Sequence, residues 1–310
     1  MRRNFRLALT AVCLVLISGR YFQTLPAHTL EGFTMDSYYR VTIPGHRVKE
    51  LTTVVNNELV RLTQRYDLFQ PESFLNRYSR EELPADQELA QLLAVAAKFQ
   101  NLSDGAYTVQ IAPLTLLWKK AIAEQIPPER DQVTTALDQL NLGPNLDLGS
   151  LLKGYGVDRV YHLIQETGVR RGLVDIGGTV RVIGTPSIAR REWRVAVRNP
   201  AGGKPLGYFK LLPGQAIATS GDYERGFDYN GQRYHHLIDP RTGYPASGYR
   251  GVSVVASDGL TADILSTLFF ITGPEGVMAI EEFVPCRALF VDKNGKVTIY
   301  GSLSVAWVEN

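Results

Sequence analysis

The pattern of hydrophobic and polar positions divides the chain into a mostly helical first half and a strand-rich second half. Alternation over residues 38–43 predicts one strand near the beginning. Apolar residues then recur at helical spacing over residues 47–66, and helices are also predicted at 88–102, 112–123 and 131–140. Residues 147–165 are typical of a turn that leads into a helix. Gly168 follows the last of these helices as a candidate C-terminal cap.

From residue 172 onward, β-rich runs dominate. Residues 172–183 contain two such runs around Gly177 and Gly178, a spacing typical of a hairpin. Further runs predict strands at 192–198, 208–212, 216–219, 251–257 and 288–292, and one or two more within 297–308. Two helices interrupt them, one around residues 260–273 and a short one at 274–283. No break in composition marks a linker, so we expect an α+β fold in which residues 28–310 form a single domain.

The helix predicted around residue 263 carries candidate metal ligands. Asp263 and Thr267 are polar positions four residues apart in an apolar segment, so their side chains share one face of the helix. A carboxylate and a hydroxyl on successive turns suit a hard divalent cation, which takes oxygen ligands. The alternative is structural, with Asp263 capping the helix and Thr267 bonding back to a carbonyl group.

Two adjacent histidines lie shortly before that helix. His235 and His236 belong to an alternating segment, 232–238, which runs into a turn over residues 239–243. Because neighbouring side chains of a strand face opposite ways, at most one of the two histidines enters a given site. We expect the other histidine to be structural or exposed.

The first residues are typical of an export signal. A basic start over residues 1–6 precedes an apolar run over 7–17, which is short for a membrane span but suits the core of a signal peptide. We expect residues 1–24 to be a signal peptide or a retained N-terminal anchor, through which the protein would associate with a membrane. Outside this segment Cys286 is the only cysteine, so no intramolecular disulfide is expected.

Composition and signature motifs exclude several functional classes. The formal net charge of the 310 residues is +2, and residues 1–24 contribute arginines but no acidic residue, so the remainder is close to neutral. Without a basic stripe or an aromatic platform, a nucleic-acid partner is not expected. The chain also lacks CxxC, HExxH, phosphate-loop and G-x-G-x-x-G signatures, which disfavours zinc, P-loop and Rossmann sites.

Nine short tracts resemble, in one order along the chain, the motifs of a known family. They are Thr34-Met-Asp-Ser-Tyr-Tyr-Arg-Val41, Phe69-Gln-Pro-Glu-Ser73, Asp104-Gly-Ala-Tyr107, Pro113-Leu-Thr-Leu-Leu-Trp118, Leu146-Asp-Leu-Gly-Ser-Leu-Leu-Lys-Gly-Tyr-Gly-Val-Asp158, Asp175-Ile-Gly-Gly178, Ala218-Thr-Ser-Gly-Asp-Tyr-Glu224, His236-Leu-Ile-Asp-Pro-Arg-Thr-Gly243 and Asp263-Ile-Leu-Ser-Thr267. One tract alone is a weak signal, but nine in sequence are specific. On these grounds the chain resembles the ApbE family, the FAD:protein FMN transferases.

The resemblance implies a fold and an activity. The fold would be a single ApbE-like domain of the T-fold type, with helices mainly in the N-terminal half and antiparallel sheet mainly in the C-terminal half. The enzyme would split FAD with Mg²⁺ and attach FMN through a phosphoester to a Ser or Thr of an exported or membrane flavoprotein. The acceptor would carry a Ser/Thr-Gly-Ala-Thr-like segment, for example in a respiratory-complex subunit. The expected location is the periplasm, or the periplasmic face of a bacterial inner membrane.

The resemblance also implies roles for individual residues. Asp263, Thr267 and the backbone carbonyl of Ser150 would bind Mg²⁺, and His236 is the candidate general base, since imidazole titrates near neutral pH. The positions where family members contact FAD correspond here to Met35, Phe69, Ala106, Tyr107, Thr108, Asp147, Lys153 and Leu237. Simpler roles are open to the same residues: core packing for Met35 and Leu237, packing between helices for Phe69 and Tyr107, helix capping for Asp147 and a solvated position for Lys153.

Two departures from the family pattern keep other functions open. Thr108 and Gln110 stand where family members usually have an aspartate and a threonine, and Met35-Asp36-Ser37 replaces the usual Met-Gly-Thr. The lost carboxylate removes a charged hydrogen bond worth roughly 1.5 to 3 kcal/mol. These departures motivate binding of FAD without catalysis as an alternative to transfer. A further alternative is hydrolysis of FAD to FMN and AMP, since the same metal site would serve.

Overall fold

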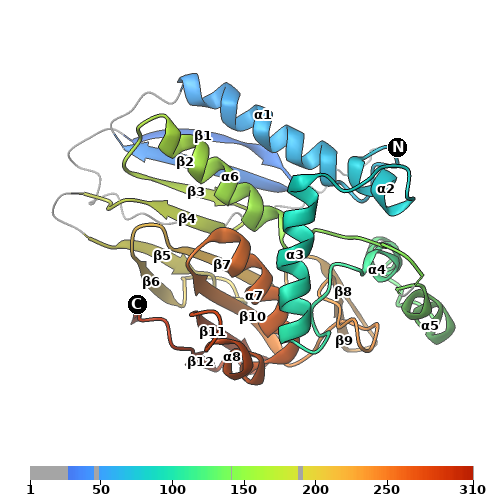
Figure 1. Cartoon of the computed structure of the whole chain (residues 1–310). Helices are drawn as coiled ribbons and strands as arrows, with labels where there is room; N and C mark the ends of the chain where they lie inside the picture. Colours follow the sequence, from blue (N-terminus) through green and yellow to red (C-terminus); the bar gives the residue numbers. More distant parts are fainter. Residues whose placement is uncertain (1–26, 45–48, 141, 188–190, 310) are drawn as a thin grey trace, which may run out of the picture.

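The computed structural model describes residues 27–44, 49–140, 142–187 and 191–309. The predicted signal peptide or anchor, residues 1–24, lies outside the described residues, as do the first two residues of the helix predicted from residue 47. In the described part, helices and antiparallel strands are combined in one structure (Figure 1). The expected α+β class is confirmed.

An eight-stranded sheet forms the centre of the structure (Figure 1). Its strands follow the order β1, β2, β3, β4, β7, β10, β11, β12, and every neighbouring pair is antiparallel. The bounds are β1 Ala27–Thr34, β2 Ser37–Pro44, β3 Gly172–Ile176, β4 Thr179–Ile183, β7 Ala216–Gly221, β10 Tyr249–Ala256, β11 Arg287–Asp292 and β12 Val297–Tyr300.

Three helices cover one face of this sheet, and a smaller sheet covers part of the other. The helices are α1 (Lys49–Tyr66), α6 (Leu152–Glu166) and α7 (Gly259–Thr272), with α6 packed between α1 and α7. Their buried apolar side chains form two core clusters with the strands below. On the opposite face, a third cluster joins the large sheet to the three-stranded sheet of β5 (Trp193–Val197), β6 (Gly207–Leu211) and β13 (Ala306–Glu309).

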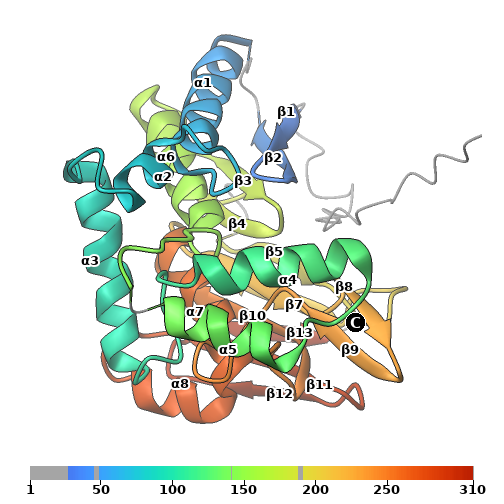
Figure 2. The same ribbon diagram turned by 90° about the vertical axis from the view of Figure 1, so that its right-hand side faces the viewer.

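Five further helices and a two-stranded hairpin complete the described part of the fold. Helices α4 (Ala112–Glu124) and α5 (Arg130–Gln139) lie side by side (Figure 2) and share a cluster with the hairpin of β8 (Gly226–Tyr229) and β9 (Gln232–His235). Helix α3 (Gln87–Leu102) joins the core cluster beside α7, while α2 (Phe74–Ser79) follows α1 and α8 (Pro274–Ile280) follows α7.

Most predicted elements match the observed ones within a few residues. Three elements are absent from the prediction: strand β1, the six-residue helix α2 and strand β8. The hairpin predicted around Gly177 and Gly178 is present as β3 and β4. Both glycines have positive φ, 59° and 90°, a conformation that other residues adopt only with strain.

Candidate active site

Helix α7 places Asp263 in the interior. The helix begins after Asp258, whose side chain accepts the Thr261 N–H at 2.7 Å and so occupies the capping position. Asp263 lies one turn further on and is only 5% exposed, so it does not cap the helix. The Ser266 hydroxyl donates to the Asp263 carbonyl at 2.9 Å, whereas Thr267 lies 3.3 Å from Ser220 on β7. Asp263 therefore does not cap α7, and the Thr267 hydroxyl contacts a side chain of β7.

The Asp263 carboxylate is held by a neighbouring helix and a strand. Its Oδ2 accepts the backbone N–H of Gly154 on α6 at 2.7 Å, and the Thr179 hydroxyl on β4 lies 3.4 Å from Oδ1. Burial raises the pKa of Asp263 to about 6, although the charge of Lys153 and these donors lower it. A cation bound to this carboxylate would offset that cost of burial.

The bond to Asp263 caps the start of α6. Gly154 is the third residue of this helix, so its N–H is one of the first amide groups, which have no backbone partner within the helix. Here it donates to Asp263, and within the described residues no backbone N–H donates to the Ser150 carbonyl oxygen. The Ser150 hydroxyl lies 3.0 Å from the Tyr107 hydroxyl, and burial raises the pKa of that tyrosine. Among the described residues, the Ser150 carbonyl oxygen thus has no backbone donor, and its segment reaches Asp263 through the Gly154 N–H.

The three predicted metal ligands all offer oxygen atoms. They are the Asp263 carboxylate, the Thr267 hydroxyl one turn away on α7 and the Ser150 carbonyl. No cluster of three or more His, Cys, Asp or Glu residues is found within the described ranges. Carboxylate, hydroxyl and carbonyl oxygens are what a hard divalent cation prefers, so these residues fit such an ion.

The structure separates the two histidines. His235 is buried against Phe270, its Nε2 lies 2.9 Å from the Ala246 carbonyl oxygen, and its Nδ1 accepts the Leu237 N–H at 3.2 Å. His236 follows the end of β9, and its Nδ1 lies 3.3 Å from the Arg225 carbonyl oxygen. Because a carbonyl only accepts, Nδ1 of His236 carries the proton and Nε2 is left free to accept one.

The electrostatics of His236 favour a neutral ring. Burial lowers its pKa below the ordinary value, and the charges of Arg225 and Lys153 lower it further. Lys153 also acts on Asp263 and on Asp175, whose pKa burial raises to about 7. One lysine on the first turn of α6 therefore lies within electrostatic reach of the carboxylates and of the histidine.

A tight turn brings Met35 to the same helix. Met35 and Asp36 form the two-residue turn between β1 and β2, and both have positive φ, 48° and 56°. The Met35 side chain packs beside Gly156 on α6, with its Cε 3.2 Å from where a Cβ of residue 156 would be. Asp36 forms an ion pair with Arg225 at 3.7 Å, so this turn also contacts the segment that bonds His236.

Three other predicted FAD contacts are Ala106, Leu237 and Asp147. Ala106 and Leu237 are buried in the core. Asp147 accepts the Thr115 hydroxyl at 2.7 Å and the Gly149 N–H at 2.8 Å, and it does not cap α6, whose N-cap residue is Leu151.

Phe69 and Thr108 make contacts of their own. The Phe69 ring is exposed, and the Lys119 ammonium lies 2.8 Å from its centroid. The Thr108 hydroxyl accepts the Gln110 N–H at 3.0 Å and lies 3.3 Å from the Gln100 side-chain oxygen. The threonine that replaces the family's aspartate is thus engaged in a local turn.

Sequence reasoning missed three groups in contact with the candidate metal ligands. They are the Thr179 hydroxyl, the Gly154 N–H and the Ser220 hydroxyl. Each lies in or directly beside a tract already recognised, so proximity to a motif is the signal that points to them. Their contacts depend on how α6, α7, β4 and β7 pack, which the sequence pattern does not specify.

Comparisons with known proteins identify the family of this chain. The ApbE family model matches residues 35–290. A FAD:protein FMN transferase of Vibrio cholerae is 30% identical over 322 residues, covering 94% of each chain, and one of Klebsiella pneumoniae is 30% identical over 240 residues, covering 71% of this chain and 74% of its own. No helix among the described residues is long and apolar enough to cross a membrane.

Solved structures show the same fold. The ApbE protein of Thermotoga maritima superposes with a TM-score of 0.79 at 28% identity, covering 88% of this chain and 96% of its own. The flavin transferase ApbE of Vibrio cholerae gives a TM-score of 0.75 at 26% identity, covering 89% and 98%. With the family match spanning most of the chain, the protein belongs to the ApbE family.

Proposed function

We propose that this protein is a Mg²⁺-dependent transferase that moves FMN from FAD to a Ser or Thr hydroxyl of another protein. Flavin transfer is the activity named for its relatives. The observation that carries the metal-dependent form of the proposal is the bond from the Gly154 N–H to the buried Asp263 carboxylate, which ties the segment of Ser150 to α7. Among the described residues, no backbone N–H donates to the Ser150 carbonyl oxygen.

Three groups would hold the cation: the Asp263 carboxylate, the Thr267 hydroxyl and the Ser150 carbonyl. When bound, Mg²⁺ supplies positive charge that offsets the negative charge on the pyrophosphate of FAD. Lys153, on the first turn of α6, adds a further positive charge on the same side, as its effect on Asp263 indicates.

In the reaction, the acceptor hydroxyl oxygen attacks the phosphorus of the FMN half of FAD. The new phosphoester forms as the bond to the bridging oxygen breaks, and AMP leaves. The hydroxyl proton passes to Nε2 of His236, which the Arg225 carbonyl oxygen holds in the tautomer that can accept it. A neutral imidazole is required for this step, and the lowered pKa of His236 favours one.

The acceptor is proposed from the family resemblance, and its location from the first residues of the chain as well. We propose an exported or membrane flavoprotein with a Ser/Thr-Gly-Ala-Thr-like segment, and a site of action at the periplasmic side of a bacterial inner membrane. The basic and apolar pattern of residues 1–24 supports export.

Hydrolysis is a second candidate for the same site, because water can replace the acceptor hydroxyl without any other change. Binding of FAD without catalysis is motivated by Thr108, whose hydroxyl is engaged with Gln110 instead of offering a carboxylate to FAD.

One assay separates these functions. The protein is incubated with FAD and Mg²⁺, with and without a peptide or domain that carries the acceptor segment, and AMP and protein-bound flavin are measured. Covalent flavin with equal AMP supports transfer, and AMP without covalent flavin supports hydrolysis. Tight FAD binding with no AMP at any Mg²⁺ concentration would leave only the binding function.

A further inference from the structure

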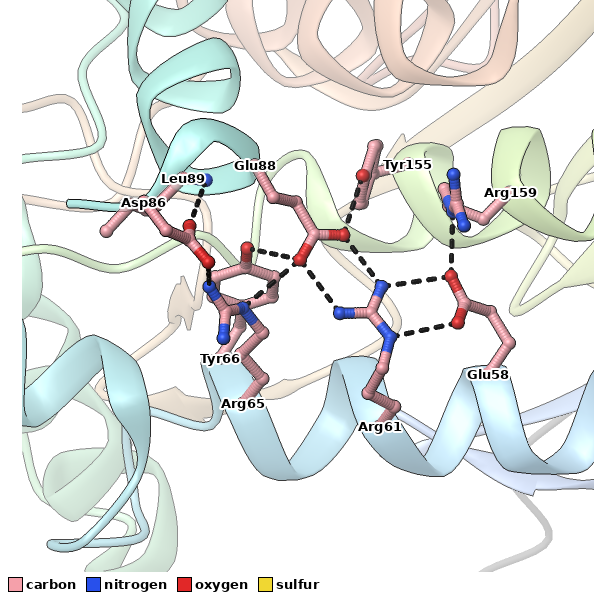
Figure 3. A network of polar contacts seen from close by, with 9 residues as sticks. All are labelled: Glu58, Arg61, Arg65, Tyr66, Asp86, Glu88, Leu89, Tyr155 and Arg159. Atoms are coloured by element: carbon pink, nitrogen blue, oxygen red, sulfur yellow. Dashed lines mark hydrogen bonds and ion pairs between the residues drawn. The ribbon is translucent and has the colours of Figure 1, made fainter.

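A polar network joins three helices on the outer side of α6 (Figure 3). Its hub is Glu88, in the first turn of α3. Glu88 Oε1 accepts from Arg61 at 2.7 Å and from the Tyr155 hydroxyl at 2.8 Å. Glu88 Oε2 accepts from Arg61 at 2.8 Å and from the Tyr66 hydroxyl at 3.1 Å, and it forms an ion pair with Arg65 at 3.1 Å. One carboxylate is thus bound by side chains from α1 and α6.

A second carboxylate completes the connection between α1 and α6. Glu58 accepts two bonds from Arg61, at 2.9 and 3.0 Å, and one from Arg159 at 2.7 Å. Figure 3 shows Tyr155 and Arg159 projecting from α6 toward the two glutamates. Because these residues are four apart, they lie on one face of α6, and both side chains on that face donate to the glutamates.

The glutamates of the network are shielded from water. The side chains of Glu58 and Glu88 are 11% and 20% exposed. Burial raises the pKa of Glu88, but the bonds from Arg61 and Tyr155 outweigh it and lower the pKa to about 2. Glu88 is therefore charged at any physiological pH. Bidentate pairing with arginine also fixes its orientation, which a single lysine would not.

The network binds α6 at the same turn that contacts Asp263. Tyr155 directly follows Gly154, whose N–H binds Asp263. Glu88 and Asp263 thus hold consecutive residues of one helical turn from different sides. Gly154 is packed closely against the start of α7, because an added Cβ there would lie 2.3 Å from the Gly259 carbonyl oxygen. A shift of Tyr155 would move the Gly154 N–H relative to Asp263.

We propose that Glu88 and Tyr155 are positioning residues for the cation-binding group. They hold the first turn of α6 so that the Gly154 N–H orients the Asp263 carboxylate. Neither residue is a predicted contact of FAD or of the metal. This inference rests on the proposed Mg²⁺-dependent function.

The chain offers a matched pair of variants for the test. Tyr155→Phe and Tyr66→Phe each remove one phenolic hydrogen bond to the same Glu88 carboxylate, but only Tyr155 belongs to α6. With Tyr155→Phe, the Mg²⁺ concentration that gives half-maximal AMP release from FAD should rise roughly two- to tenfold, the range expected for one hydrogen bond. The kcat at saturating Mg²⁺ should change less than about twofold. Tyr66→Phe should leave the half-maximal Mg²⁺ concentration unchanged.

Hydrogen exchange gives a readout that does not depend on turnover. Backbone amide exchange of a peptide spanning residues 150–156 is measured by mass spectrometry in both variants, with urea unfolding curves to compare their global stability. Tyr155→Phe should accelerate exchange in this peptide, while Tyr66→Phe, at similar global stability, should not. If Tyr155→Phe does not fold, Glu88→Gln takes its place, since it keeps the shape of the hub and removes its charge.

The outcomes distinguish this inference from the proposed function. Equal effects of the two tyrosine variants on Mg²⁺ dependence and exchange, or no effect of either, would overturn the positioning role. A wild-type protein that releases no AMP with Mg²⁺ would overturn the proposed function. In that case the exchange comparison still decides whether Tyr155 holds the first turn of α6.

Discussion

A methyl group added at Gly154 tests whether the contact between α6 and α7 sets the geometry of Asp263. The Cβ of Gly154→Ala would lie 2.3 Å from the Gly259 carbonyl oxygen and 2.7 Å from the Asp263 Cβ. Both distances are far below van der Waals contact, and a backbone carbonyl cannot rotate away. The two helices therefore have to separate, which lengthens the 2.7 Å bond from the Gly154 N–H to Asp263.

The expected cost combines three effects. Overpacking costs about 1 to 3 kcal/mol, and weakening a hydrogen bond to a charged group costs about 1.5 to 3 kcal/mol. Alanine gains about 1 kcal/mol over glycine in helix propensity, which offsets part of the loss. We expect Gly154→Ala to lower the free energy of unfolding by about 2 to 4 kcal/mol. It should also raise the Mg²⁺ concentration that FAD cleavage requires.

Gly156→Ala is the matched control. Its Cβ would meet the Met35 Cε at 3.2 Å and the Ile176 Cδ1 at 3.3 Å, the ends of side chains that can adjust. The same propensity gain applies, so its stability should stay within about 1 kcal/mol of wild type. Urea unfolding measures both variants, and a change of midpoint at unchanged m-value reports stability.

Either of two results would refute the reasoning. Equal stability of the two alanine variants would show that the α6–α7 contact accommodates a methyl group. Loss of stability in Gly154→Ala with unaltered Mg²⁺ dependence would show that this contact does not orient Asp263.

Three other substitutions extend the test. Asp263→Asn should reduce AMP release at least about a hundredfold. In EDTA at pH 7.5 it should raise the free energy of unfolding by about 1 to 3 kcal/mol, because it removes a buried charge whose pKa is raised to about 6. The AMP assay measures the first effect, and calorimetry with and without EDTA measures the second. Burial lowers the pKa of His235 to about 4, so its contribution to stability is complete above pH 6.5 and is lost as the pH falls toward 4. The free energy of unfolding, measured across this window, should depend less on pH in His235→Phe than in the wild type. Asp158→Ala should cost about 3 to 5 kcal/mol, seen as a lower Tm, because it leaves the Arg181 guanidinium and the first N–H groups of α7 without their acceptor.

The fold was predictable where an element buries its own apolar residues. Helix α1 carries buried residues at regular spacing, and strands such as β10 are nearly continuous runs of apolar residues. Strand β1 lacks that signal because Gly32 occupies an inward position. The Tyr39 ring of β2 covers this glycine, so the apolar group comes from a different strand.

The candidate site was predictable only along single elements. Helical spacing placed Asp263 and Thr267 on one face of α7. It could not place the Gly154 N–H, because the first N–H groups of a helix have no partner within it and their partner depends on what packs against the helix end. The Thr179 hydroxyl likewise meets Asp263 only through the packing of α7 against the sheet.

The pairing of β2 with β3 has a consequence for how the protein folds. The two strands are neighbours in the sheet, yet helices α1 to α6 all lie between them in the chain. Closing so long a loop costs conformational entropy and slows folding. In refolding, helical structure should therefore appear before β2 docks, and Met35, at the turn joining β1 to β2, would reach α6 only in the last stage.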